Sequence, residues 1–413
     1  MQFFFFLFFL VSVLIFGSIK IGPFSLRIYM TVIMTMYLIA FRTKKKDNSK
    51  TIRSDYIRLF LVCILTLFVS LTINGGLVAY GFWERFLAYY IVCIVAYYSV
   101  DYFVRERKQF DKIVLLLSMI IILDTTVTIL QYLNNPIGWG VGAIFSDVEE
   151  FAEFLNNHDS FVGVSKLPGI FGHPVNNGFF LCVATVLLLS GIKVGTGKGK
   201  NIIISFYYMA VFASSLVACL FLQQRAAFYL ILLFTAYHFL KAFLTHPGRI
   251  IVPAFIIVLL ILLFLPDDIG SFDAGKLART DNSSRTSVWE WAFMVILQNP
   301  VFGNILQYNA AAEYSAHNVL IDSLIDSGIL GFIPVFILYL KTILDSTRIM
   351  LRAKDNYLKV YSYSVLTCMG MSMFHNASYM TGDVIIFIVL ALMFKAQNLF
   401  GESCVSIRKR VTQ

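Results

Sequence analysis

The chain alternates between apolar runs of about 16 to 22 residues and short polar connections. An α-helix of that length crosses the roughly 30 Å of hydrocarbon in a bilayer. The ten-residue alternating pattern of a membrane strand does not recur along the sequence. The pattern therefore predicts an all-α, polytopic membrane bundle of twelve helices, near residues 3–19, 24–41, 59–80, 87–104, 113–134, 177–192, 202–222, 226–243, 250–265, 317–340, 360–375 and 383–397.

Composition strengthens this interpretation. Hydrophobic residues make up 58% of the 413 positions and charged residues only 14%, which is far from the composition of a soluble domain. The first run, MQFFFFLFFLVSVLIFG, has no basic leader and no small-residue cleavage site, so we expect a retained helix and not a signal peptide. Neither a fixed-period repeat nor a low-complexity linker is visible, and residues 1–413 are predicted to form a single membrane domain.

The positions of lysine and arginine predict the orientation, because basic loops resist translocation. With a cytoplasmic N-terminus, 25 of the 33 Lys and Arg residues fall on the inner side. Both termini are then cytoplasmic. The net charge of +9 is accounted for by attraction to the inner leaflet and does not indicate nucleic-acid binding. The inner connections are residues 42–58, 105–112, 193–201, 241–249, 341–359 and the tail from 395.

Two outward connections are long enough to carry chemistry on an exported substrate, residues 135–176 and 266–316. The first is acidic, and its stretch SDVEEFAEFL has an N-cap and helical apolar spacing, which predict a short surface helix. The second contains WEWAFMVIL, which we expect to lie in the membrane interface with its tryptophans at headgroup level.

Metal and disulfide chemistry find little support. The six cysteines show no C-x-x-C spacing, so neither a zinc site nor a disulfide framework is predicted. Asp267 and Asp268 form a bare acidic pair, which is more typical of solvated carboxylates than of a divalent-metal site.

Three outer arginines stand out against the acidic loops: Arg225, Arg279 and Arg285. Arg225 lies where one predicted span ends and the next begins, and a charge at the hydrocarbon edge requires a partner. One interpretation is contact with lipid phosphates, or a salt bridge to Asp267 or Asp268. The other is a pyrophosphate clamp, since guanidinium groups bind phosphate oxygens at two points.

His317 begins the stretch AHNVLIDSLIDSGILGF and is followed by Asn318. A histidine at a helix start is most often a cap or a satisfied interfacial side chain. The helix dipole there disfavours imidazolium and keeps the ring neutral, which is the form that a general base needs. On the catalytic interpretation, Asn318 orients His317.

The same stretch carries two aspartates and two glycines inside an apolar helix. Asp322 and Asp326 lie one turn apart, so we expect them to point into the bundle and to pair with polar groups, with a proton pathway as the alternative. Gly328 and Gly331 are predicted to let another helix approach closely.

Four segments resemble the bacterial O-antigen ligase and O-antigen polymerase superfamily. The first is His317-Asn318 followed, after nine residues, by G-x-x-G at Gly328 and Gly331. The others are LQQRAAFYLIL around Arg225, RTSVWEWAFMVILQNPVFGN from Arg285, and GIFGHPVNNGFFLCV, in the order that the family shows. The resemblance covers roughly residues 165–340. Gln224, where the family often has Ser or Thr, and His173, where a small or polar residue is usual, depart from the family pattern.

The resemblance implies a membrane glycosyltransferase of the GT-C type that acts on the periplasmic face. Its donor is a glycan linked to undecaprenyl pyrophosphate, and no nucleotide sugar, metal or other cofactor is required. By carry-over, Arg225 and Arg285 hold the pyrophosphate and His317 is the general base. Arg279 is also predicted to bind the pyrophosphate. Residues placed to contact the glycan are Trp289, Trp291, Tyr308, Tyr314 and His173, although aromatic residues at an interface more commonly serve as anchors.

Three functions remain open at this point. A polymerase joins lipid-linked repeat units and works with a chain-length regulator, and outer loops rich in Tyr and Asn favour it. A ligase moves finished glycan to lipid A-core. A transporter or flippase for lipid-linked oligosaccharide suits twelve helices, but such proteins usually carry charged or broken helices at mid-membrane.

Overall fold

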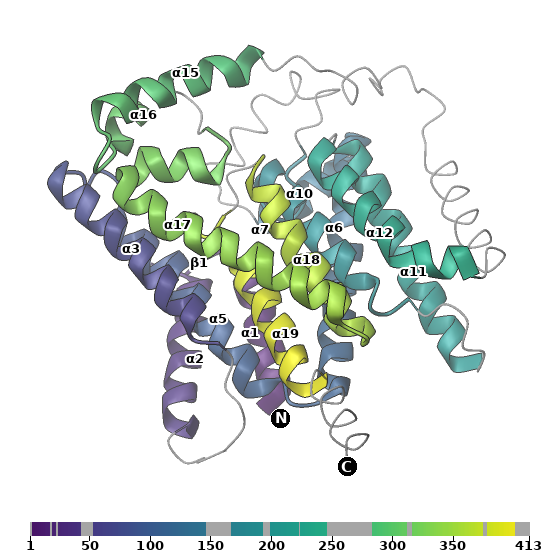
Figure 1. Ribbon diagram of the computed structural model, residues 1–413. Coiled ribbons are helices and arrows are strands. Elements are labelled where there is room, and N and C mark those ends of the chain that lie inside the picture. The colour runs from purple at the N-terminus through teal and green to yellow at the C-terminus, as the bar shows by residue number, and fades with distance from the viewer. Residues whose placement is uncertain are drawn as a thin grey trace.

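The computed structural model describes residues 2–16, 19–21, 24–42, 53–145, 167–192, 199–222, 224–245, 283–311, 316–374 and 378–400. Within these ranges the chain is helical apart from one short hairpin (Figure 1). The helices are α1 (Gln2–Leu14), α2 (Leu26–Arg42), α3 (Asp55–Ile73), α4 (Phe82–Arg85), a π-helical turn (Phe86–Tyr90), α5 (Ile91–Phe103), α6 (Arg107–Tyr132), α7 (Pro136–Phe145), α10 (Pro174–Leu188), α11 (Gly199–Phe221), α12 (Arg225–Thr245), α15 (Ser283–Gln298), α16 (Ile305–Ala311), α17 (Val319–Arg352), α18 (Asn356–Ser372) and α19 (Val384–Phe400).

The all-helical class is confirmed. Eleven of the twelve predicted spans overlap helices, and the twelfth, residues 250–265, lies outside the described residues. By length and composition, five helices of the described part are able to cross a membrane: Asp55–Ile73, Phe82–Phe103, Arg107–Tyr132, Ile203–Phe221 and Val319–Arg352. The hairpin pairs β1 (Lys20–Ile21) with β2 (Phe24–Ser25) between α1 and α2.

The outer connections contain more helix than the sequence predicted. Residues 135–176 begin with α7, and residues 266–316 contain α15 and α16. The surface helix predicted over SDVEEFAEFL lies outside the described residues.

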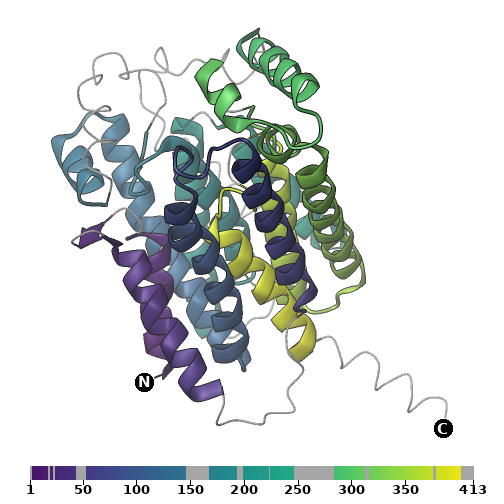
Figure 2. The ribbon, with the colours of Figure 1, turned by 90° about the vertical axis from the view of Figure 1, so that its left-hand side faces the viewer.

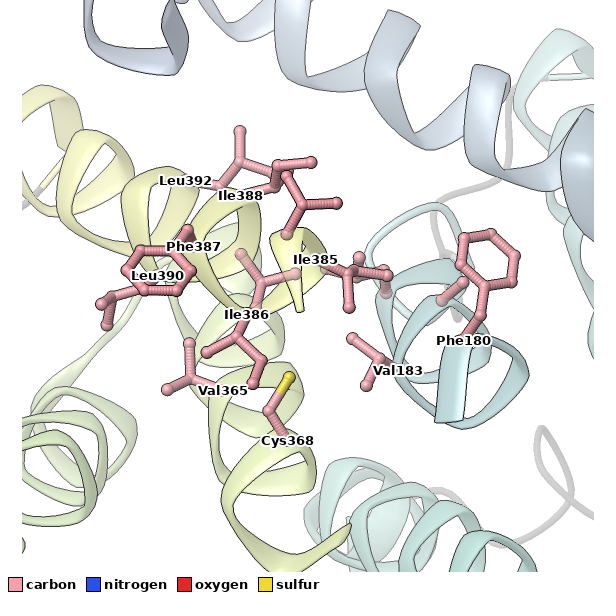
Figure 3. Packing of buried hydrophobic residues seen from close by; sticks show 14 of the residues in the cluster. Phe180, Val183, Val365, Cys368, Ile385, Ile386, Phe387, Ile388, Leu390 and Leu392 are labelled. Carbon is pink, nitrogen blue, oxygen red and sulfur yellow. The ribbon is translucent and has the colours of Figure 1, made fainter. Parts of the chain in front are cut away.

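Helix α19 forms the centre of the bundle. Every residue from Val384 to Ala396 is buried. Figure 3 shows its isoleucines beside Val365 and Cys368 of α18 and Val183 of α10. Because lipid tails are as apolar as these side chains, close packing and not water exclusion holds such helices together in a membrane.

Helices α3 and α17 lie side by side at the periphery and expose apolar side chains. Leu65 on α3 and Ile333 on α17 are 59% and 49% exposed. Exposed rows of this kind are expected on helices that face lipid.

The two ends of the bundle differ in content. One end holds the start of α1 and the end of α19, and the opposite end holds α15 and α16 (Figures 1 and 2). At the first end, two ion pairs connect the basic segments that were predicted to share one side: Arg53 binds Asp345 at 2.7 Å, and Arg107 binds Asp355 at 3.2 Å. The end that holds α15 and α16 is called the outer end below, and the opposite end is called the inner end.

Candidate active site at the outer end

His317 lies immediately before α17, at the outer end. Its φ of +53° is in the left-handed region, which few residues other than glycine adopt. A conformation of that kind persists where neighbouring contacts determine it. His317 is half-buried, so its imidazole is neither fully exposed nor enclosed in the core.

Contacts on both sides of His317 fix its backbone. On one side, the Ala316 amide donates to Asp322 Oδ1 at 3.1 Å, and the Ala316 carbonyl accepts from Trp289 Nε1 at 2.9 Å. On the other side, Asn318 Oδ1 caps α17 by accepting from the amides of Leu320 and Ile321. The histidine is therefore held between a fixed residue and a helix cap.

Asn318 has a structural task of its own. Besides capping α17, its Nδ2 donates to the Met373 carbonyl just after α18, at 3.3 Å. The orienting role of Asn318 toward His317 stays a prediction.

Helix α15 carries Arg285 one turn before Trp289. The Trp289 hydrogen bond ties this helix to the residue that precedes His317. A small apolar cluster strengthens the contact and consists of Ala292, Val295, Tyr308, Ala316 and Ile325. The backbone of Arg285 is thereby placed near His317, although its side chain lies outside the described part of the chain.

A break in α17 at Gly328 sets the direction of the segment that follows His317. Gly328 has φ +60° and ψ −157°, a conformation that is open to glycine and is not helical. A Cβ at this position would lie 2.4 Å from the Val301 carbonyl, and a Cβ on Gly303 would lie 2.6 Å from the Gly328 amide. Gly328 and Gly303 therefore allow the turn between α15 and α16 to pack into the break in α17.

Hydrogen bonds hold the inserted turn in place. The Pro300 carbonyl accepts from the Ile329 amide at 2.9 Å, so the break does not leave that amide unpaired. On α3, Asn74 Nδ2 donates to the Gly303 carbonyl at 2.9 Å, and the Ser70 hydroxyl lies beside the Phe302 and Asp326 carbonyls. The sequence predicted that another helix approaches Gly328, but the segment that approaches it is a turn. A Cβ on Gly331 would lie 3.6 Å from Thr66 of α3.

Arg225 is the first residue of α12, and its side chain also lies outside the described part. The residue before it, Gln224, donates through Nε2 to the Pro174 carbonyl at 3.0 Å, at the start of α10. Leu230, five residues after Arg225 on α12, packs against Gly370 of α18. Helix α18 ends beside Asn318. The backbones of Arg225, Arg285 and His317 are therefore all at the outer end, and Gln224 serves as an anchor between α10 and α12.

The predicted glycan contacts differ in their exposure and in their hydrogen bonds. Trp291 is 47% exposed and Trp289 is 37% exposed, with its indole N–H engaged by Ala316. His173 is exposed and caps α10, accepting from the Val175 amide. Tyr308 on α16 is only 2% exposed and packs in the small apolar cluster with residues of α15 and α17, and its contact with a sugar stays a prediction. Tyr314 and Arg279 lie outside the described residues.

Burial also affects the hydroxyl group of Tyr308, because this residue of α16 packs with residues of α15 and α17. Burial and the nearby Asp322 raise the pKa of Tyr308 to about 12, so its hydroxyl stays protonated at any physiological pH. The residue therefore contributes a neutral, packed ring to the support of His317 and not a titrating group.

The two aspartates of α17 differ. Asp322 pairs with the Ala316 amide, as predicted for a polar partner, and so takes part in holding His317. Asp326 is 9% exposed, and its backbone carbonyl lies beside Ser70 of α3.

A network of buried polar side chains, which the sequence analysis did not single out, holds the loop that precedes α10. Asp124 Oδ1 accepts from the Ile170 amide at 3.0 Å, and Gln131 Oε1 accepts from the Gly169 amide at 2.9 Å. Asn177 donates to the Leu167 carbonyl at 3.1 Å. The loop before His173 is thus fastened to α6 and α10. The sequence signal for this network is the presence of polar residues within apolar spans.

Among the residues that the structure describes, no group of three His, Cys, Asp or Glu side chains is placed to hold a metal ion. The five cysteines in that part are buried and unpaired with one another.

Comparison with known proteins connects this geometry to a family. No curated protein matches the chain. Residues 210–336 match the model of a family described as O-antigen ligase, a stretch that contains Arg225, Arg285, His317, Gly328 and Gly331. The match confirms the resemblance drawn from those sequence motifs that fall within residues 210–336.

Proposed function

We propose that the protein is a membrane glycosyltransferase that polymerises oligosaccharide repeat units carried on undecaprenyl pyrophosphate. The observation that carries the proposal is the hydrogen bond from Trp289 to Ala316, because it joins the helix that bears Arg285 to the residue before His317. The family match supports glycosyl transfer, and the location of Arg225 at the same end supports a shared site.

In the proposed reaction, a sugar hydroxyl of the acceptor attacks the anomeric carbon of the donor. A new C–O bond forms as the bond to the pyrophosphate breaks, and the hydroxyl proton passes to the neutral imidazole of His317. A positioned base of this kind typically accelerates a reaction by about 10²- to 10⁴-fold. A single displacement with the base opposite the leaving group inverts the anomeric configuration.

Negative charge collects on the departing pyrophosphate. Arg225 and Arg285 are assigned to stabilise it, because fixed guanidinium groups in a partly dry site need little reorganisation as charge develops. The chain's own residues therefore supply the base and the leaving-group contacts, and no cofactor is invoked.

The proposed location is the bacterial inner membrane, with both termini in the cytoplasm and His317 on the periplasmic side. The gathering of basic segments at the end opposite His317 supports this orientation under the positive-inside tendency. A chain-length regulator is the proposed protein partner.

His317→Ala tests the proposed base. We expect glycan transfer by purified protein to fall by about 10²-fold or more, with thermal unfolding unchanged because the imidazole is only half-buried. Retained transfer by a folded His317→Ala protein would rule out the assigned role.

Arg225→Lys tests the clamp, because a point charge cannot make the two-point contact of a guanidinium. We expect loss of the polysaccharide ladder in cells. Arg352→Lys, an exposed arginine at the inner end, is the matched control and should leave the ladder unchanged.

The family description also names a ligase, which makes that reaction the second candidate function. A deletion strain separates the two. Lipopolysaccharide that carries a single repeat unit supports the polymerase, whereas polymer that accumulates on undecaprenyl carrier supports the ligase.

A further inference from the structure

A cavity of about 630 Å³ lies beside α1, α2, α4 and the start of α10. Its remaining walls come from residues 78–81, Tyr89 and Tyr90 of the π-helical turn, Phe171 and residues 380–385. All of its lining residues lie outside the family-matched segment, residues 210–336. The cavity is therefore built from other parts of the chain than the segment that carries Arg225, Arg285 and His317.

Two arginines line this cavity. The Arg27 guanidinium lies 5.5 Å from the centre of the Tyr89 ring, and the Arg85 guanidinium lies 4.4 Å from that of Tyr80. Among the described residues, the ion pairs involve other cations, at the inner end. Arginines that stack on aromatic rings and form no ion pair with a carboxylate are suited to bind phosphate.

Arg27 also has an unsatisfied donor. Its Nε is buried and has no hydrogen-bond partner among the described residues. An unpaired buried donor is destabilising, and more so when it is charged, so an anion bound in the cavity would relieve that cost.

Among the described residues, neither carboxylate of the cavity forms an ion pair with these arginines. Asp383 Oδ2 accepts from the Ser378 amide at 2.9 Å and from Thr381 Oγ1 at 2.6 Å, within its own turn. Glu84 is exposed.

Apolar walls indicate the rest of the ligand. Leu14, Phe179, Phe180 and Val384 line the cavity together with the arginines. Helix α1 starts at the inner end and has 13 residues, so it rises about 20 Å, less than the roughly 30 Å hydrocarbon core. The cavity beside its far end therefore lies at the depth of lipid and not of bulk water.

We propose that this cavity binds the phosphate group of a membrane lipid through Arg27 and Arg85. This step rests on the proposed function: joining two lipid-linked repeat units requires two carrier pyrophosphates at once, and the clamp of Arg225 and Arg285 accounts for one. The Arg27 and Arg85 cavity holds the second carrier, with its apolar chain along α1 and α10.

Lipid counting by native mass spectrometry tests the proposal on the purified full-length chain, with undecaprenyl pyrophosphate as the probe. We expect two lipids on the unaltered protein and one on the Arg27→Gln, Arg85→Gln double variant, with the lost site weakened at least about tenfold. The control Arg352→Gln should keep two. Unchanged binding by the folded double variant would overturn the proposal.

A second variant, which keeps both Arg27 and Arg85, tests the cavity even if the double variant fails to fold. Val78 is 92% exposed and lines the cavity, so Val78→Trp should block entry without loss of folding. We expect it to bind one lipid. Two lipids on Val78→Trp would count against the cavity as the entry site.

Two further arms separate this proposal from the proposed function and identify the lipid. Arg225→Gln, Arg285→Gln should also bind one lipid; if it binds two, the assigned clamp is wrong while the result for Arg27 and Arg85 still stands. Excess phosphatidylglycerol should not displace the carrier. Displacement by phosphatidylglycerol would overturn the carrier assignment and identify an ordinary phospholipid site.

Discussion

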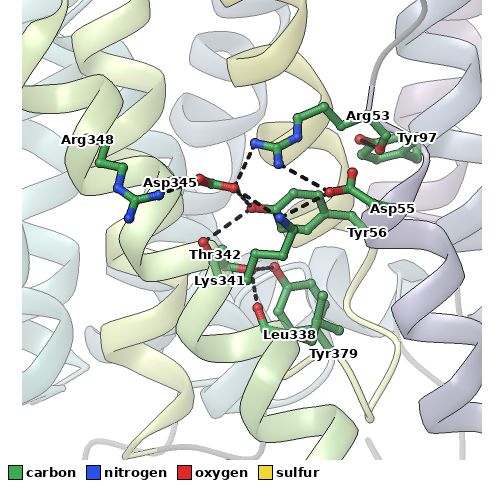
Figure 4. A network of polar contacts seen from close by, with 10 residues as sticks. All are labelled: Arg53, Asp55, Tyr56, Tyr97, Leu338, Lys341, Thr342, Asp345, Arg348 and Tyr379. Atoms are coloured by element: carbon green, nitrogen blue, oxygen red, sulfur yellow. Dashed lines mark hydrogen bonds and ion pairs between the residues drawn. The ribbon is translucent and has the colours of Figure 1, made fainter.

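Helices α3 and α17 are joined at both of their ends, but by different means. At the inner end the contact is ionic: Asp345 binds Arg53 at 2.7 Å and Lys341 at 3.5 Å, and it accepts from Tyr56 at 2.7 Å (Figure 4). Asp55 joins the same network through Lys341 at 3.0 Å.

At the outer end the contact between the same helices is made by backbone carbonyls, Ser70, Asn74 and two glycines. None of these groups is charged. The comparison teaches that, among the described residues, cations help to hold α3 to α17 at the inner end, whereas uncharged groups hold the two helices together at the outer end.

Gly328→Ala should have the largest effect on stability, because it disturbs the uncharged contact between α3 and α17 at the outer end. The conformation is strained for alanine and the new Cβ would lie 2.4 Å from the Val301 carbonyl. We expect a loss of about 3 kcal/mol or more in the free energy of unfolding. Reversible unfolding in bicelles measures it.

Gly140→Ala is the control for that variant, since no atom lies within 4 Å of its added Cβ. A helical Gly→Ala change there should stabilise by about 0.5–1 kcal/mol. Equal free energies of unfolding for the two variants would contradict the requirement for glycine at position 328.

Asp345→Asn should come next in size. It removes the carboxylate that Arg53 and Lys341 share and that is only 13% exposed. We expect a loss of about 1–3 kcal/mol in unfolding free energy and an unchanged rate of glycan transfer by the folded protein. A large fall in that rate with stability intact would show that the inner network takes part in function.

Trp289→Phe should have a smaller effect on stability and a selective one on transfer. It keeps the ring but removes the hydrogen bond to Ala316, at a cost of about 1 kcal/mol. Because Ala316 fixes His317, we expect the transfer rate to fall several-fold. Trp291→Phe, on the same helix and more exposed, is the comparison variant for folding.

Arg348→Gln should have the smallest effect. Arg348 is 64% exposed and approaches Asp345 at 3.7 Å, so its removal should change the unfolding free energy by less than about 0.5 kcal/mol. A larger loss would mean that the inner network extends to exposed pairs.

The sequence determined the helical membrane class, the grouping of basic segments at one end, and the family motifs around Arg225 and His317. These follow from local properties: apolar length, charge placement and the order of short motifs. The cap at Asn318 also follows from the residue type, since asparagine favours that position.

Only the tertiary structure decided how those local features meet. The break at Gly328 depends on a turn around Gly303, and the left-handed His317 depends on Trp289 and Asp322. Tyr308 looks like an interfacial ring in the sequence, but the packing of α16 buries it. Arg27 and Arg85 share one cavity although 58 positions separate them, because contacts between distant segments follow from helix packing and not from local pattern.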